Sequence, residues 1–98
     1  SDERLKDNIQ PITEPLWKLN QIGGYTFDWN DKQDTYEGHD VGVVAQEIHK
    51  VLPEVVAERS NGYLGVKYEK IVPLLIESIK ELKKEVDEIK QKCDCLNK

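Results

Sequence analysis

Apolar residues recur at alternating steps of three and four along the last part of the chain. This is the a/d spacing of a coiled coil, continued over more than three heptads. Charged residues fill most positions in between, and Glu85 at a g position precedes Lys90 at the next e position. The predicted seam residues are Val72, Leu75, Ile79, Leu82, Val86, Ile89, Cys93 and Leu96. A seam this narrow gains little by folding back on its own chain, so the pattern predicts a helix over about residues 68–96 that associates with copies of itself.

The seam residues predict a coiled coil more clearly than they predict how many helices it contains. The β-branched residues at the first a positions and the leucines at the first d positions suit a parallel dimer. Ile89 lies at a d position, where a β-branched side chain packs poorly in a dimer and favours three or more strands. The alternative is an amphipathic helix that covers its own domain, and early in the helix Ile71, Leu74 and Ile76 favour it by widening the apolar face. We expect the helix to dock on a head at its start and to bundle with its copies at its end.

Composition limits what else the chain can be. Its 98 residues make one domain with a marginal core unless association adds buried area. The net charge of −5 comes from mixed acids and bases without a basic stripe, so nucleic acid is not an expected partner. The sequence has no membrane span, no signal peptide, no phosphate-binding glycine loop, and no cofactor or metal motif. Cys93 and Cys95 are too close in sequence to pair well with each other. The lack of Met predicts a fragment of a longer product.

The segment before the seam predicts a small mixed head. Thr13 as N-cap and Pro15 in the first turn predict a short helix over residues 16–22, which ends at two glycines. Alternating aromatic residues predict a half-buried strand over residues 25–29, followed by a polar loop or hairpin tip over residues 30–40.

A second helix and a second hairpin are expected after Gly42. The helix is predicted up to Pro53, with Val44, Ile48, Val51 and Leu52 on its apolar face. Strands are predicted over residues 55–57 and 63–68 around an Asn61–Gly62 turn. The sequence therefore predicts an α+β fold, with a head over residues 1–67 and a parallel coiled-coil helix, dimeric or trimeric, over residues 68–98.

Isolated polar residues give little evidence of chemistry. His39 and His49 have no partner at metal-ligand spacing and are interpreted as solvated side chains. Asp40 and Glu47 are close enough in sequence to form a carboxylate pair, although surface charge is the ordinary interpretation. From composition and spacing, the chain is a small oligomeric module and not an enzyme.

Four stretches in order change that interpretation: SDERLKDNIQPI, GGYTFDW, GHDVGVVAQEIHKVLPEVV and GYLGVKYEKIVPLLIESIKEL. Together they resemble the endosialidase-type intramolecular chaperone family, found at the C-termini of phage tailspikes and tail fibres and related to a domain in myelin regulatory factor. The resemblance covers nearly the whole chain, with only the loop over residues 30–37 outside it.

The resemblance implies a specific function. Such a domain trimerises and guides the folding of the upstream β-helical part of its own preprotein, then cuts itself off through a serine-lysine dyad. The implied dyad is Ser1 and Lys6, and this chain would be the released form. The implied setting is the host cytoplasm during phage assembly, with the preprotein in the virion tail and the released domain absent from the mature virion. Apart from the resemblance, the loop over residues 30–40 has two interpretations, a segment that holds the upstream chains and an ordinary surface loop.

The dyad places a constraint on the start of the chain. A serine hydroxyl attacks only when a base takes its proton, and lysine is such a base only when neutral. Arg4 is a conceivable cation near the lysine, although a solvated arginine is the simpler interpretation. On a regular helix Ser1 and Lys6 would point about 140° apart. The segment must therefore be non-helical, or the pair must form between chains. The rival hypotheses are a non-catalytic trimerisation module of a fibre or adhesin, and a eukaryotic relative with the same self-cleavage.

Overall fold

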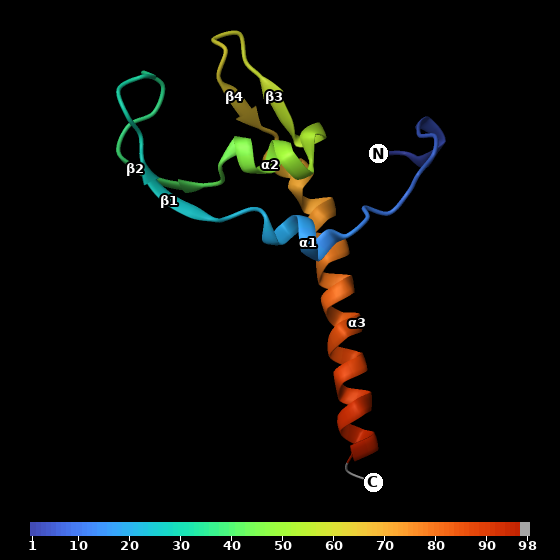
Figure 1. The fold of residues 1–98 in the computed structure, drawn as a ribbon. Coiled ribbons are helices and arrows are strands. Elements are labelled where there is room, and N and C mark those ends of the chain that lie inside the picture. The colour runs from blue at the N-terminus through green and yellow to red at the C-terminus, as the bar shows by residue number, and fades with distance from the viewer. Residues whose placement is uncertain (97–98) are drawn as a thin grey trace.

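A computed structural model describes residues 1–96, with side chains through Cys93. The molecule is a small head at one end of a long helix, with extents of 63 × 38 × 20 Å (Figure 1). The elements in chain order are α1 (Pro15–Asn20), β1 (Tyr25–Asp28), β2 (His39–Gly42), α2 (Ala45–Val51), β3 (Val56–Glu58), β4 (Leu64–Val66) and α3 (Val72–Leu96). The predicted α+β class is confirmed.

The long C-terminal helix begins with a short 3-10 turn, Tyr68–Ile71, and continues as α3. Pro73 lies in the first turn of α3. Proline is tolerated there because the backbone N–H groups of the first turn make no hydrogen bond within the helix. The C-terminal part of α3 extends well beyond the head and does not contact it (Figure 1). The predicted long helix is therefore confirmed as a single element.

The core lies where the start of α3 meets α2 and the turn after it. Four apolar side chains are buried there: Ile48, Leu52, Val55 and Leu74. Half-buried residues surround them, namely Ile12, Leu19, Ile22, Val43, Val51, Val56, Val66 and Ile71. Because Leu74 comes from α3 and Ile48 from α2, the long helix completes the core of the head as well as extending from it.

Helix α2 presents the predicted apolar face, with one exception. Ile48 and Leu52 are buried and Val51 is half-buried. Val44 was predicted on the same face, but it precedes the helix as an N-cap in extended conformation and its side chain is exposed. The predicted stop at Pro53 is confirmed, because the α-helix ends at Val51 and a 3-10 turn follows.

Helix α1 crosses the first part of α3 (Figure 1). The prediction that Thr13 caps it is wrong, because the N-cap is Glu14, in the left-handed region at φ 49°, with no side-chain cap of its own. A residue of α3 caps the first turn instead: Glu81 Oε2 accepts a hydrogen bond from the Leu16 N–H at 3.1 Å. A carboxylate suits this place because the first turn of a helix has unpaired N–H groups. Sequence spacing cannot reveal a cap that comes from a residue so far along the chain.

The strands form two separate antiparallel hairpins. In the first, β1 pairs with β2 from Tyr25 opposite Gly42 to Asp28 opposite His39. The predicted hairpin tip between them is confirmed, but β2 was missed, because residues 39–40 were assigned to the loop. Their polar side chains lie in a strand because β1 supplies the hydrogen-bonding partner.

The second hairpin pairs β3 with β4 and agrees with the predicted Asn61–Gly62 turn. Gly62 has φ 84°, a conformation that favours glycine, and its N–H donates to the Arg59 carbonyl at 2.9 Å. The Asn61 side chain accepts from the Tyr63 N–H at 3.0 Å. Strand β3 begins and ends one residue later than predicted, and β4 is shorter than the predicted strand over residues 63–68.

Ser78 on α3 is a polar residue buried at the junction of the helix and the head. Its side chain is 1% exposed, and its Oγ makes no hydrogen bond within the described residues. A buried hydroxyl without a partner destabilises a fold, and serine is a weaker helix former than alanine. We expect Ser78→Ala to raise the free energy of unfolding by about 1 kcal/mol.

Urea unfolding followed by circular dichroism, at one fixed protein concentration, measures this effect. Ser60→Ala is the matched control, because Ser60 is exposed in the β3–β4 turn. Its expected change is within about 0.5 kcal/mol. A lower midpoint for Ser78→Ala would contradict the prediction and mean that the hydroxyl has a stabilising partner.

Candidate functional site

The first six residues form a compact turn that brings Ser1 and Lys6 together. Asp2 and Lys6 are extended, and between them Glu3–Leu5 makes one 3-10 turn. As a result the Lys6 ammonium donates a hydrogen bond to Ser1 Oγ at 3.1 Å within one chain. The sequence left open a non-helical segment or a pair formed between chains, and the observed contact is of the first kind. The catalytic roles of the two residues stay predictions.

Asp2 and Arg4 hold this turn closed. Asp2 Oδ1 accepts from the Arg4 backbone N–H at 2.9 Å, as an N-cap does. The Arg4 guanidinium also forks onto the same carboxylate, with Nη2 to Oδ2 at 2.8 Å and Nε to Oδ1 at 3.1 Å. The hydrogen bond from Arg4 lowers the pKa of Asp2, and the bond to Asp2 raises the pKa of Arg4, so each group stabilises the charge of its partner. Arg4, considered from the sequence as a cation for Lys6, thus has its charge paired with Asp2.

The segment that carries this turn projects from the body. Every residue from 1 to 11 is exposed, and the segment leaves the head on the side away from the β1–β2 hairpin (Figure 1). We call residues 1–11 the N-terminal arm. Two apolar side chains on the arm are exposed to solvent, Leu5 at 85% and Ile9 at 63%. The Ser1–Lys6 pair therefore lies in water in the single chain.

The long helix has two distinct faces. One row, Leu74, Ser78 and Glu81, packs towards the head and α1. The row one residue further on is rotated by about 100° and consists of predicted seam residues, all exposed. Its members are Leu75, Ile79, Leu82, Val86, Ile89 and Cys93, and Val72 before them is exposed as well. The side chain of Leu96, the last predicted seam residue, and that of Cys95 lie outside the described part. A row of large apolar side chains left uncovered over this length is typical of an association surface.

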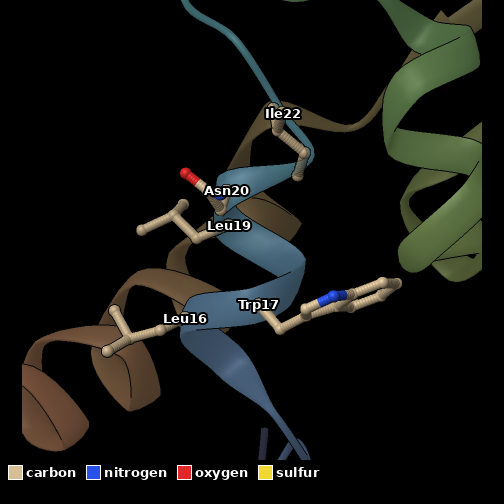
Figure 2. Close-up of a pocket in the computed structure, with 5 residues that line it drawn as sticks. All are labelled: Leu16, Trp17, Leu19, Asn20 and Ile22. Atoms are coloured by element: carbon tan, nitrogen blue, oxygen red, sulfur yellow. The ribbon is translucent and has the colours of Figure 1, made fainter.

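A shallow groove lies on α1, and Figure 2 shows the residues that line it. Its lining residues are Leu16, Trp17, Leu19, Asn20 and Ile22. The Trp17 ring lies on the opposite side of α1 from Leu16 and Leu19, and 59% of it is exposed. No titratable side chain is among the five lining residues, so the groove offers a packing surface and no acid-base chemistry.

The tip of the β1–β2 hairpin is held by specific interactions. The Gln33 side chain makes four hydrogen bonds to the backbone of residues 30–36. Trp29 stacks on Tyr36 with ring centroids 4.9 Å apart, and its Nε1 donates to Asp40 at 2.9 Å. These interactions give the hairpin tip a defined conformation. Its role in holding the upstream chains stays a prediction.

The remaining polar residues singled out from the sequence do not form a second site. Asp40 and Glu47 are not paired with each other. Asp40 binds Trp29, and Glu47 accepts from the Gly23 N–H at 3.1 Å and the Tyr25 hydroxyl at 2.7 Å. His39 is exposed, with its Nδ1 2.7 Å from the exposed Asp28 carboxylate, and His49 is exposed on α2.

Among residues 1–93, whose side chains the structure describes, no cluster of three or more His, Cys, Asp or Glu side chains is suited to a metal ion. Over the same residues, no helix combines the length and apolar character needed to cross a membrane.

The fold and the site together are a small α+β head on a long helix, with an uncovered apolar row on that helix and a serine-lysine contact on a projecting arm. The chain belongs to the family Peptidase_S74, described as "Chaperone of endosialidase", whose model matches residues 1–57. The match includes the arm, the β1–β2 hairpin and α2, and it confirms the predicted family.

Curated relatives place the family in phage tail fibres. The chain is 35% identical to the long tail fiber protein Gp37 of Enterobacteria phage K3 over 94% of its own length and 8% of that protein. It is 35% identical to the Gp37 proteins of Enterobacteria phage T2 and Salmonella phage S16, over 94% and 93% of its length. The chain spans 7% and 13% of those two proteins. It is thus similar to a small part of each fibre protein.

Proposed function

We propose that this domain is a C-terminal intramolecular chaperone that trimerises, guides the folding of an upstream fibre preprotein, and then releases itself by cutting the bond before Ser1. The observation that carries the proposal is the 3.1 Å hydrogen bond between Lys6 and Ser1 in a domain of this family. In this proposal residues 1–67 are the head and residues 68–98 the stalk. Assembly takes place in the host cytoplasm, and the released domain is absent from the mature tail.

Trimerisation is supported by the two faces of α3. The head covers the row that contains Leu74, while the adjacent row that contains Ile79 has nothing of its own chain over it in the described structure. Three parallel copies would bury this second row as an a/d seam without disturbing the head. The upstream chains would then be held at high effective concentration and in register before their slow β pairing.

The cut follows the chemistry of a serine nucleophile with a lysine base. Neutral Lys6 takes the proton of Ser1 Oγ as the oxygen attacks the carbonyl carbon of the preceding residue. The C–N bond breaks, the proton passes from Lys6 to the leaving Ser1 nitrogen, and the preceding residue is held as an ester on Oγ. Water then gives a proton to Lys6 and attacks the ester carbonyl, and the bond from that carbon to Oγ breaks. Lys6 returns the proton to Oγ, and the preceding residue leaves as a carboxylic acid. Lysine is neutral near pH 7 only when burial or a nearby cation lowers its pKa from about 10.4, so docking of the exposed arm would activate the pair.

Expression of the protein with its natural upstream residues tests the proposal. The expected result is a self-generated fragment with the N-terminal sequence SDERLK, identified by mass spectrometry, and a sedimentation mass three times that of one chain. A trimer that never produces this fragment would instead support the non-catalytic trimerisation module. A single chain across micromolar dilutions would overturn the proposal as a whole.

A further inference from the structure

The geometry of the arm raises the question of what holds Lys6 beside Ser1. All residues from 1 to 11 are exposed, so packing against the head does not fix the position of either side chain. Lysine has a long, flexible side chain that an exposed hydrogen bond restrains only weakly. The contact therefore depends on the backbone path between the two residues, which is set by the turn over Glu3–Leu5.

We propose that Asp2 and Arg4 are positioning residues for self-cleavage: their paired side chains lock the turn that presents Lys6 to Ser1. This inference rests on the proposed function. It assigns the two residues no contact with the scissile bond. They act through the backbone, and Ser1 and Lys6 do the chemistry.

The hydrogen bonds of the turn support this role. Asp2 contributes its backbone carbonyl to the Leu5 N–H at 3.1 Å and its carboxylate to the Arg4 N–H at 2.9 Å. The Glu3 carbonyl then accepts from the Lys6 N–H at 3.1 Å, which fixes where the lysine side chain begins. One 3-10 turn is unstable in water by itself, because few hydrogen bonds offset the entropy of ordering it.

The guanidinium of Arg4 also binds the side chain of Asp2 across the turn. Its fork onto both oxygens of Asp2 is the planar two-point contact that arginine makes and lysine does not. Because both residues are exposed, the pair contributes little to the stability of the head. Its effect is local, on the fraction of time that Lys6 spends beside Ser1.

Cleavage rates in the protein with its natural upstream residues test this role. Loss of the lock is expected to slow the cut by about 3- to 30-fold, the range that an exposed ion pair and a helix cap allow together. Asp2→Ala removes both the cap and the fork and should be slowest. Asp2→Asn keeps an oxygen for the cap and should recover part of the rate. Arg4→Gln and Arg4→Lys both lose the fork and should be slowed alike, and Asp2→Ala combined with Arg4→Gln should be no slower than Asp2→Ala.

The pH profile separates positioning from an electrostatic effect on the base. If Asp2 and Arg4 only position Lys6, each variant is slower at every pH with an unchanged midpoint. A midpoint that moves in Arg4→Gln, or a normal rate in Arg4→Lys, would overturn the inference, because then the charge of Arg4 and not its fork would matter. Asp7→Asn, an exposed carboxylate outside the turn, is the control and should cleave normally.

Failure of this inference is distinguishable from failure of the proposed function. Normal cleavage in Asp2→Ala or Arg4→Gln, while Ser1→Ala is inactive, overturns the positioning role alone. Additive losses in the double variant would overturn it too, because they would mean that the residues act independently. Cleavage that persists in Ser1→Ala would reject the dyad itself.

Discussion

Replacing Ser1 by alanine, in the protein that keeps its upstream residues, is expected to abolish the cut before residue 1. Alanine has no oxygen to attack the preceding carbonyl, and we expect the rate to fall by about 1000-fold or more. Lys6→Ala should have an effect of similar size, because the hydroxyl loses its proton acceptor. The release of the SDERLK fragment over time, followed by mass spectrometry, measures both effects.

Lys6→Arg makes this test sharper. Arginine keeps the positive charge and a long side chain but stays protonated, so it is unable to act as a base. It should therefore be as inactive as Lys6→Ala. Lys50→Ala, which makes the same change as Lys6→Ala at an exposed site on α2, is the control and should cleave normally. Efficient cleavage by Lys6→Arg would show that the lysine has only an electrostatic role.

The second large effect is expected from Ile79→Asp on α3. Ile79 is 65% exposed in the single chain and lies at a predicted a position of the seam. In a trimer this substitution would place three carboxylates in one apolar layer, with an unfavourable free energy of association of at least about 3 kcal/mol per chain. Analytical ultracentrifugation at micromolar concentration should show single chains where the unaltered protein is trimeric.

Lys84→Asp is the matched control for this experiment. Lys84 is exposed on the same helix at an f position, which faces away from the seam of a coiled coil. It introduces the same residue and should leave the trimer intact. The far-ultraviolet circular dichroism of the head should persist in both variants, because Leu74 and not Ile79 belongs to its core. A trimeric Ile79→Asp protein would mean that another surface joins the copies.

The parts of the fold that the sequence predicted are those with strong local signals. The long helix follows from the regular spacing of its apolar residues, and the β3–β4 turn follows from Asn61–Gly62. The features that it missed depend on distant partners. Strand β2 forms because β1 lies beside it. The Leu16 N–H in the first turn of α1 donates to Glu81, a residue that no local sequence rule connects to this helix.

The candidate site shows the same division. The resemblance identified Ser1 and Lys6, but the way in which they meet depends on backbone dihedral angles. A fully extended or a fully α-helical backbone over the same residues would have separated the two side chains. The Asp2–Arg4 pair that closes the turn has a signal in the sequence, an acid two residues before an arginine. Pairs of this kind are so common on protein surfaces that the pattern indicates no function by itself.

The N-terminal arm has a consequence for what cleavage leaves behind. Because residues 1–11 contribute nothing to the buried core, the proposed hydrolysis at the start of the arm would sever a tether and no structural support. The remaining domain should keep its shape and its resistance to heat. The reaction would therefore draw no driving force from relaxation of the head.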